Sequence, residues 1–224
     1  MVKTGSSILE LFSMLAILLP VIPLLIIVFR KLYALPVIQL LTIACLLGFG
    51  EFLVRFINID PAKENLVNAL FRTTDCALLL LLFKVMSEKK LSEILNFTLI
   101  CSTSVFIAIY FTTGIEKHHA VIRYVQGFLM IGSSILVLAQ LVRLRESLLF
   151  ELPVFWIASA TFFYYCMSLI IERITVGQVA TTNASTDKII LFHLIHFVRY
   201  LFYIITVIIT HPRQETLEPD NDLL

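Results

Sequence analysis

Charge is scarce in this sequence. Only 15% of its 224 residues are Asp, Glu, Lys or Arg, and 59% are hydrophobic, whereas a soluble domain of this length carries about one-quarter charged residues. The net charge is +1, so no excess of one sign favours nucleic acid as a partner. The hydrophobic residues stand in long runs with few polar residues between them, which is typical of membrane spans. We therefore expect one integral membrane domain over residues 1–210 and a short cytoplasmic tail over 211–224.

Motifs of several enzyme classes are also missing. None of the seven glycines belongs to a Gly-rich phosphate loop, a Walker pattern or a nucleophilic serine turn. The four cysteines form no CxxC pair and lie in apolar runs, where a thiol usually packs as a small apolar group. We assign no catalytic residue, no metal ligand and no cofactor, and we favour a protein that is not an enzyme.

Seven apolar runs are long enough to cross a hydrocarbon core about 30 Å thick, which takes ~20 helical residues. They are continuous, whereas spanning β-strands would alternate over about ten residues. The sequence therefore predicts an all-α membrane bundle of seven transmembrane helices. The first run is longer than a signal-peptide core of ~7–15 residues, and we expect it to remain as a span. The runs cover residues 8–29, 33–57, 65–86, 92–112, 121–142, 153–173 and 188–210.

Basic residues between the runs predict the orientation, because cytoplasmic loops are richer in Lys and Arg. One side of the membrane receives Arg30, Lys31, Lys89, Lys90, Arg143, Arg145 and Arg213, and the other receives Lys3, Lys63, Lys117 and Lys188. This bias favours an outer N-terminus and an inner C-terminus. The inner loops and tail are short, so we expect any signal to leave through a cytoplasmic or membrane partner.

Ionisable residues inside the runs are the main functional indication. Each one near the bilayer centre costs ~2.5–3.5 kcal/mol even on a lenient insertion scale. In the orientation above, most lie in the outer half of the membrane or near its middle. At ~100° per residue, Arg72 and Asp75 share one face of the third run, and His193, His196 and Arg199 share one face of the seventh.

Polar helix faces at the same depth in the membrane cost the least free energy when they face one another. We therefore predict a polar cavity that opens to the outside and is closed below by apolar packing. The positive side chains slightly outnumber the negative ones, which favours a small ligand with an anionic group. The candidate ligand-binding residues are Glu51, Arg72, Asp75, Gln126, Tyr165, Glu172, His193, His196 and Arg199.

Two structural alternatives stay open. Glu51 with Arg55, and Arg72 with Asp75, have the spacing of ion pairs within one helix. Three arginines are close enough to span ends for their side chains to reach the membrane interface: Arg55, Arg123 and Arg173. In either case the polar faces would hold helices together, in this chain or in a larger membrane complex.

A membrane-embedded lipid hydrolase is the alternative from another functional class. His193 and His196 share a helix face, and with a carboxylate they could hold a metal ion. Seven-span hydrolases of the alkaline ceramidase and adiponectin-receptor type instead place H-x-x-x-H on the last helix and a third histidine on the second. Here the spacing is one residue shorter and the second run has no histidine. Lys188 lies at the start of the last run rather than midway, which disfavours a retinal protein.

Three features resemble a family of uncharacterised seven-transmembrane inner-membrane proteins common in Bacteroidota. These are the Pro153-Val-Phe-Trp-Ile segment followed by Tyr164-Tyr165, the Asn65-x-x-Asn68 pattern leading into Arg72 and Asp75, and the plan of about 220 residues with a basic third loop. The third run departs from the family's Tyr-x-x-x-Glu pattern. The resemblance implies a bacterial inner membrane and a role in envelope sensing. Together with the polar faces, it leads us to expect a sensor or receptor-like membrane protein.

Overall fold

The computed structural model describes residues 18–56, 61–112, 115–144, 149–177 and 182–211. Most of these residues are in α-helices, with two short 3₁₀ helices at Leu32–Ala34 and Leu149–Glu151. This confirms the predicted all-α class. The α-helices are α2 (Val21–Phe29), α3 (Pro36–Phe56), α4 (Pro61–Met86), α5 (Lys89–Thr112), α6 (Ile115–Leu144), α7 (Pro153–Gly177) and α8 (Thr182–Ile209).

Six of these helices, α3 to α8, are long and apolar enough to cross a membrane. They correspond to the second to seventh predicted runs, and they indicate an integral membrane protein embedded in a lipid bilayer. Of the first predicted run, residues 8–17 lie outside the described residues. The remainder forms the nine-residue helix α2 after a turn at Leu19 and Pro20, so a seventh span stays a prediction.

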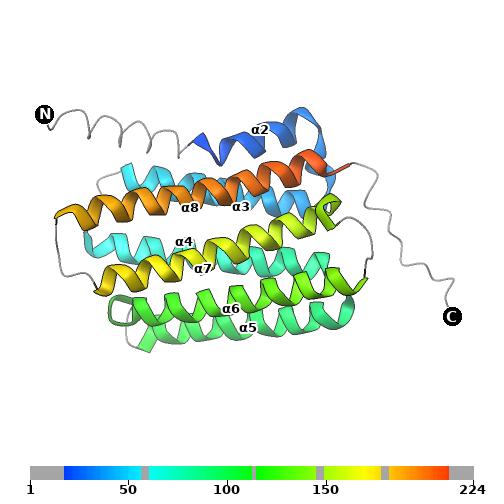
Figure 1. The fold of residues 1–224 in the computed structure, drawn as a ribbon. Helices are drawn as coiled ribbons and strands as arrows, with labels where there is room; N and C mark the ends of the chain where they lie inside the picture. The colour runs from blue at the N-terminus through cyan, green and yellow to red at the C-terminus, as the bar shows by residue number, and fades with distance from the viewer. Residues whose placement is uncertain (1–17, 57–60, 113–114, 145–148, 178–181, 212–224) are drawn as a thin grey trace, which may run out of the picture.

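The long helices form two layers. Helices α3, α4 and α5 make one layer, α8, α7 and α6 make the other, and α2 lies along the edge formed by α3 and α8 (Figure 1). Within each layer, helices that follow one another in the chain pack side by side. Helix α4 also contacts α6 and α7 in the other layer. Helices α4 and α8 therefore face each other diagonally across the centre of the bundle.

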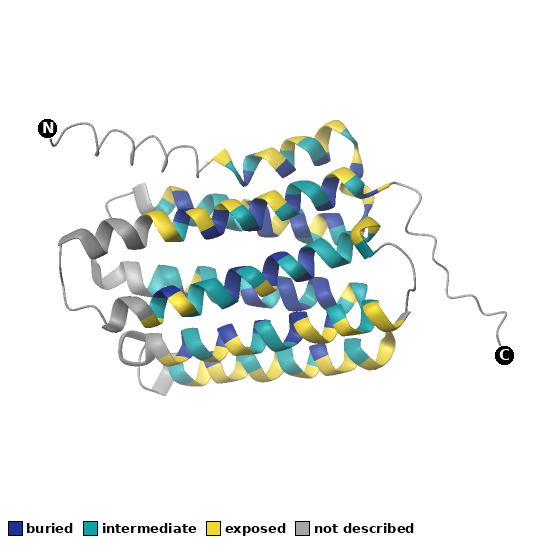
Figure 2. Cartoon of the chain, in the orientation of Figure 1, coloured by how far each residue is buried: buried dark blue, intermediate teal, exposed yellow. Residues whose placement is uncertain are grey.

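Burial follows this arrangement. The central faces of α3, α4, α7 and α8 are buried, whereas α5 is largely exposed along its length (Figure 2). Large apolar side chains such as Phe97, Ile100 and Phe128 stand on the outside of the bundle. In a membrane protein these side chains face lipid, so their exposure costs nothing there.

Arg30 fixes α2 to the end of α8. Its guanidinium donates hydrogen bonds of 2.6 Å to the backbone carbonyls of both Val207 and Ile208. The last four carbonyls of a helix have no partner within the helix, and a cation there also complements the negative end of the helix dipole. The short helix α2 thus closes the C-terminal end of α8.

We expect Arg30→Gln to loosen this end of α8. The charged hydrogen bonds contribute on the order of 1–3 kcal/mol, and their loss should raise hydrogen exchange of the amides at residues 205–210 by about tenfold. Lys31→Gln is the control, because Lys31 is an exposed neighbour of the same charge. Equal exchange in the two variants would contradict the capping role.

Candidate functional site

The charged centre of the bundle lies deep in the apolar part of the helices. Asp75 is nine residues inside the apolar span Leu66–Met86 of α4, and Arg199 is nine residues inside the span Ile190–Ile209 of α8. At ~1.5 Å per residue, both lie roughly 14 Å from the start of their spans. That depth is close to the middle of a hydrocarbon core about 30 Å thick.

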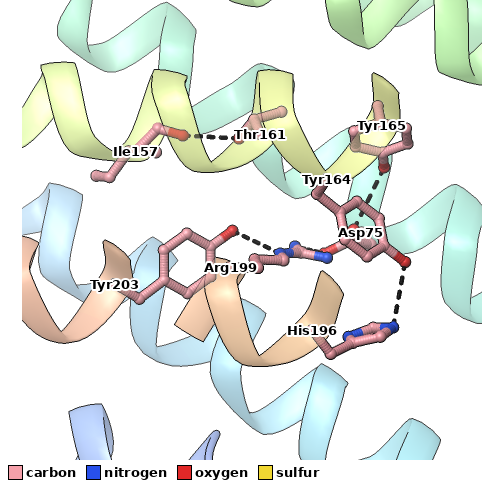
Figure 3. Close-up of polar contacts among 8 residues, drawn as sticks. All are labelled: Asp75, Ile157, Thr161, Tyr164, Tyr165, His196, Arg199 and Tyr203. Carbon is pink, nitrogen blue, oxygen red and sulfur yellow. Dashed lines mark hydrogen bonds and ion pairs between the residues drawn. The ribbon is translucent and has the colours of Figure 1, made fainter. Parts of the chain in front are cut away.

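Asp75 and Arg199 form an ion pair at this depth. Arg199 Nη2 lies 2.6 Å from Asp75 Oδ1, and the side chains are only 4% and 14% exposed for Arg199 and Asp75 respectively. The Tyr165 hydroxyl donates to Asp75 Oδ2 over 3.3 Å (Figure 3). Because two charges removed from water require both pairing and hydrogen bonds, the three helices α4, α7 and α8 are held together here.

Aromatic rings enclose the guanidinium of Arg199. Its Cζ atom lies 4.6 Å from the centre of the Tyr164 ring and 5.4 Å from that of Tyr203, within the range of cation–π attraction. Arg199 Nε donates to the Tyr203 hydroxyl over 3.0 Å, one turn along α8 (Figure 3). The i, i+4 spacing of Arg199 and Tyr203 makes this contact possible within one helix.

A second ion pair lies closer to the end of the bundle where α6 starts and α7 ends. Arg123 Nη1 on α6 lies 2.7 Å from Glu172 Oε1 on α7. On the neighbouring turn of α6, Gln126 Nε2 donates to Thr73 Oγ1 on α4 over 2.9 Å. The polar faces of α4, α6 and α7 therefore meet one another, as their shared depth predicts.

Two adjoining cavities lie among these groups, with volumes of about 20 and 40 Å³. By the usual volume per water molecule, they have room for one and for two or three waters respectively. Four residues line both cavities, so the two spaces meet there: Arg72, Arg123, Tyr164 and Ser168. The first is also lined by Glu51, Asp75, Gln126, Gly127, Tyr165 and Leu169, and the second by Ile171, Glu172, Phe192 and Ile195.

Arg72 differs from the other charged groups around the cavities. Asp75 pairs with Arg199, Arg123 pairs with Glu172, and Glu51 has an interaction of its own. Within the part of the chain that the structure describes, no hydrogen bond or ion pair engages the guanidinium of Arg72. A guanidinium carries a permanent charge and five N–H donors, so Arg72 is the group most able to bind an anion.

The two histidines have an aromatic environment. The His193 ring is stacked on Phe52 with centroids 6.0 Å apart, and the His196 ring packs on Phe192 at 4.3 Å. His196 Nε2 lies 3.4 Å from the Tyr164 hydroxyl (Figure 3). Neither histidine is among the residues that line the two cavities. His196 packs against Tyr164 and His193 against Phe52, and neither forms a wall of these two cavities.

No family model, curated protein or solved structure matches this chain. The resemblance to Bacteroidota inner-membrane proteins therefore stays a prediction. Among the described residues, no group of three or more His, Cys, Asp or Glu side chains is placed to hold a metal ion.

The structure brings most of the candidate residues together. Glu51, Arg72, Asp75, Gln126 and Tyr165 line the first cavity, and Glu172 lines the second. Arg199 lies against them through its contact with Asp75. The pairing itself differs from the alternative of ion pairs within one helix, because Asp75 binds Arg199 on α8 rather than Arg72 on its own helix. Arg123 likewise pairs with Glu172 instead of standing alone at the membrane interface.

Three polar residues that line the cavities were absent from the candidates. Arg123 and Ser168 each share a helix face with a candidate, since Arg123 precedes Gln126 by three residues and Ser168 follows Tyr165 by three. The helical period could therefore have found both. Tyr164 had no such signal, because it is rotated about 100° from Tyr165 on the same helix, yet both side chains reach the site.

Proposed function

We propose that this chain is a receptor-like membrane protein that binds a small anion at Arg72. The observation that carries the proposal is a permanent cation lining both cavities without an ion-pair partner among the described residues. Arg72 is half-buried, and a charge that is partly removed from water is stabilised by pairing. An anion entering the cavities would supply the ion-pair partner that Arg72 lacks among the described residues.

The same geometry suggests how binding could be transmitted. Arg72 and Asp75 are separated by one helical turn on α4, and Asp75 holds α8 through Arg199. An anion at Arg72 changes the electrostatic potential at the Asp75 carboxylate. This change favours one packing arrangement of α4 against α8 over another. Both helices continue to the opposite end of the bundle, where α4 ends at Met86 and α8 ends at Ile209.

The orientation of the protein in the membrane is part of this proposal. With the basic residues Arg30, Lys89 and Arg143 on the cytoplasmic side, the cavities lie in the outer half of the membrane and the end of α8 lies inside. We place the protein in a bacterial inner membrane, with its ligand arriving from outside and a cytoplasmic or membrane partner reading the helix packing.

The proposal predicts anion binding that depends on Arg72. Purified protein in lipid nanodiscs should show a higher Tm in millimolar acetate, chloride or inorganic phosphate, because a ligand that binds only the folded state stabilises it. Arg72→Gln should weaken binding of the effective anion by at least tenfold, since it removes the charge but keeps a shorter polar side chain.

Arg173→Gln is the matched control. Arg173 is an exposed arginine near the same end of the bundle, so its replacement removes an equal charge away from the cavities. The proposal fails if none of the three anions raises Tm, or if Arg72→Gln responds to them as the unmodified protein does.

A further inference from the structure

The junction where the two cavities meet is lined by hydrogen-bond donors. Four side chains line both cavities, and each of them carries N–H or O–H groups: Arg72, Arg123, Tyr164 and Ser168. None of the four is a carboxylate. The guanidinium of Arg72 has no ion-pair partner within the part of the chain that the structure describes. An anion at this junction would therefore meet side chains with donors on three helices, α4, α6 and α7.

Carboxylates line each cavity away from the junction. Glu51 and Asp75 line the first cavity, and Glu172 lines the second. Glu51 shares its cavity with Arg72, but among the described residues no ion pair joins these two side chains. An anion that extends from the junction into either cavity approaches a carboxylate and is repelled by it. The arrangement therefore favours an anion that is small enough to stay beside the donors.

The volumes of the cavities set the same limit. Cavities of about 20 and 40 Å³ hold about three or four water-sized positions in total. Acetate and phosphate each have several non-hydrogen atoms and would fill or exceed this space. A halide is a single atom, and chloride is only slightly larger than a water molecule. Chloride at the junction leaves room for waters that complete its hydrogen bonding.

We infer that this junction binds a halide ion of the size of chloride, held by the guanidinium of Arg72 and the hydroxyl of Ser168. The inference rests on the proposed function, because it requires Arg72 to bind an anion. A halide accepts hydrogen bonds from any direction, whereas each buried oxygen of an oxyanion needs a donor of its own. Beyond the junction, the wall of the second cavity offers no side-chain donor over Ile171, Phe192 and Ile195.

The Tm of the protein in nanodiscs, measured over increasing anion concentrations, tests the class of ion. The buffer contains gluconate, an anion too large for the cavities, so that chloride is absent at the start. Chloride and bromide should bind with affinities within about threefold of each other. Acetate and phosphate should bind about tenfold more weakly or not at all, because their oxygens would lack donors. Acetate or phosphate binding as tight as that of chloride would overturn the inference.

Ser168→Ala tests the position of the ion. It removes one hydroxyl from the junction and leaves Arg72 in place, so chloride should bind about tenfold more weakly, as expected for a lost hydrogen bond to a charged group. Ser134→Ala is the matched control. Ser134 is a buried serine outside the cavity lining, and its hydroxyl donates to the Met130 carbonyl within α6. Equal chloride affinity in the two variants would overturn the inference.

The outcomes also separate the halide from the proposed function. If acetate or phosphate raises Tm through Arg72 and chloride does not, the halide inference fails while the anion receptor stands. If no anion raises Tm in a way that depends on Arg72, both fail. Chloride binding that Arg72→Gln and Ser168→Ala each weaken, and that Ser134→Ala leaves unchanged, supports a halide at the junction.

Discussion

Arg199→Met should lower the free energy of unfolding by about 3–5 kcal/mol. Removing one partner of a buried ion pair leaves an uncompensated charge in a nonpolar surrounding, and Asp75 is only 14% exposed beside Arg199. Methionine fills a similar length with apolar atoms, so the loss reports the stranded carboxylate more than a cavity. Asp75→Leu should cost a comparable amount, because it strands the guanidinium. Unfolding of the purified protein in mixed micelles by a denaturing detergent measures both.

The double variant distinguishes pairing from packing. Asp75→Leu combined with Arg199→Met removes both charges, and apolar replacements of a buried pair are often neutral or stabilising. We expect its stability to return to within about 1 kcal/mol of the unmodified protein. Arg173→Met, at an exposed arginine, should change stability by less than ~0.5 kcal/mol. Losses that simply add in the double variant would show that the two side chains do not depend on each other.

The long helices could be predicted from the sequence because apolar runs of about 20 residues have few alternatives in a membrane. The boundaries were less accurate. Helix α6 covers Ile115–Leu144, whereas the apolar run covers 121–142, and α8 starts at Thr182 rather than at 188. Polar residues continue the backbone hydrogen bonding of a helix beyond its apolar part, so hydropathy marks the span rather than the helix. The turn at Leu19 and Pro20 shows the converse, since an apolar run need not be one continuous helix.

The candidate site was predictable as far as helical periodicity reaches. The period places Asp75 with Arg72 and Arg199 with His196 on shared faces, and these faces do point into the bundle. The helical period contains no information on which helices pack against each other. The partner of Asp75 depends on the diagonal placement of α4 and α8, and the packing of the histidines on Phe52 and Phe192 depends on side-chain rotamers. These features come from the tertiary arrangement and not from spacing along one helix.

Gly48→Ala should also destabilise the protein, by ~1–3 kcal/mol, the usual cost of overpacking a buried site. A Cβ atom on Gly48 of α3 would collide with the Tyr200 hydroxyl on α8, and Tyr200 is only 1% exposed, so its ring has little room to move. Gly132→Ala is the matched control within a helix, because nothing lies within 4 Å of a Cβ there. That change should be neutral or stabilise by ~0.5–1 kcal/mol through helix propensity.

Tyr200→Phe should recover most of the stability lost in Gly48→Ala, since it removes the hydroxyl and leaves only the ring carbon Cζ at 3.1 Å from the added Cβ. The contact matters for the site because Tyr200 directly follows Arg199 on α8. We expect the fit of the Tyr200 hydroxyl against Gly48 to fix the rotation of α8 at which Arg199 meets Asp75. Gly48→Ala should therefore also weaken the stability coupling between Asp75 and Arg199, measured by the same double-variant cycle in the Gly48→Ala background. An unchanged coupling would mean that the ion pair alone sets the rotation of α8.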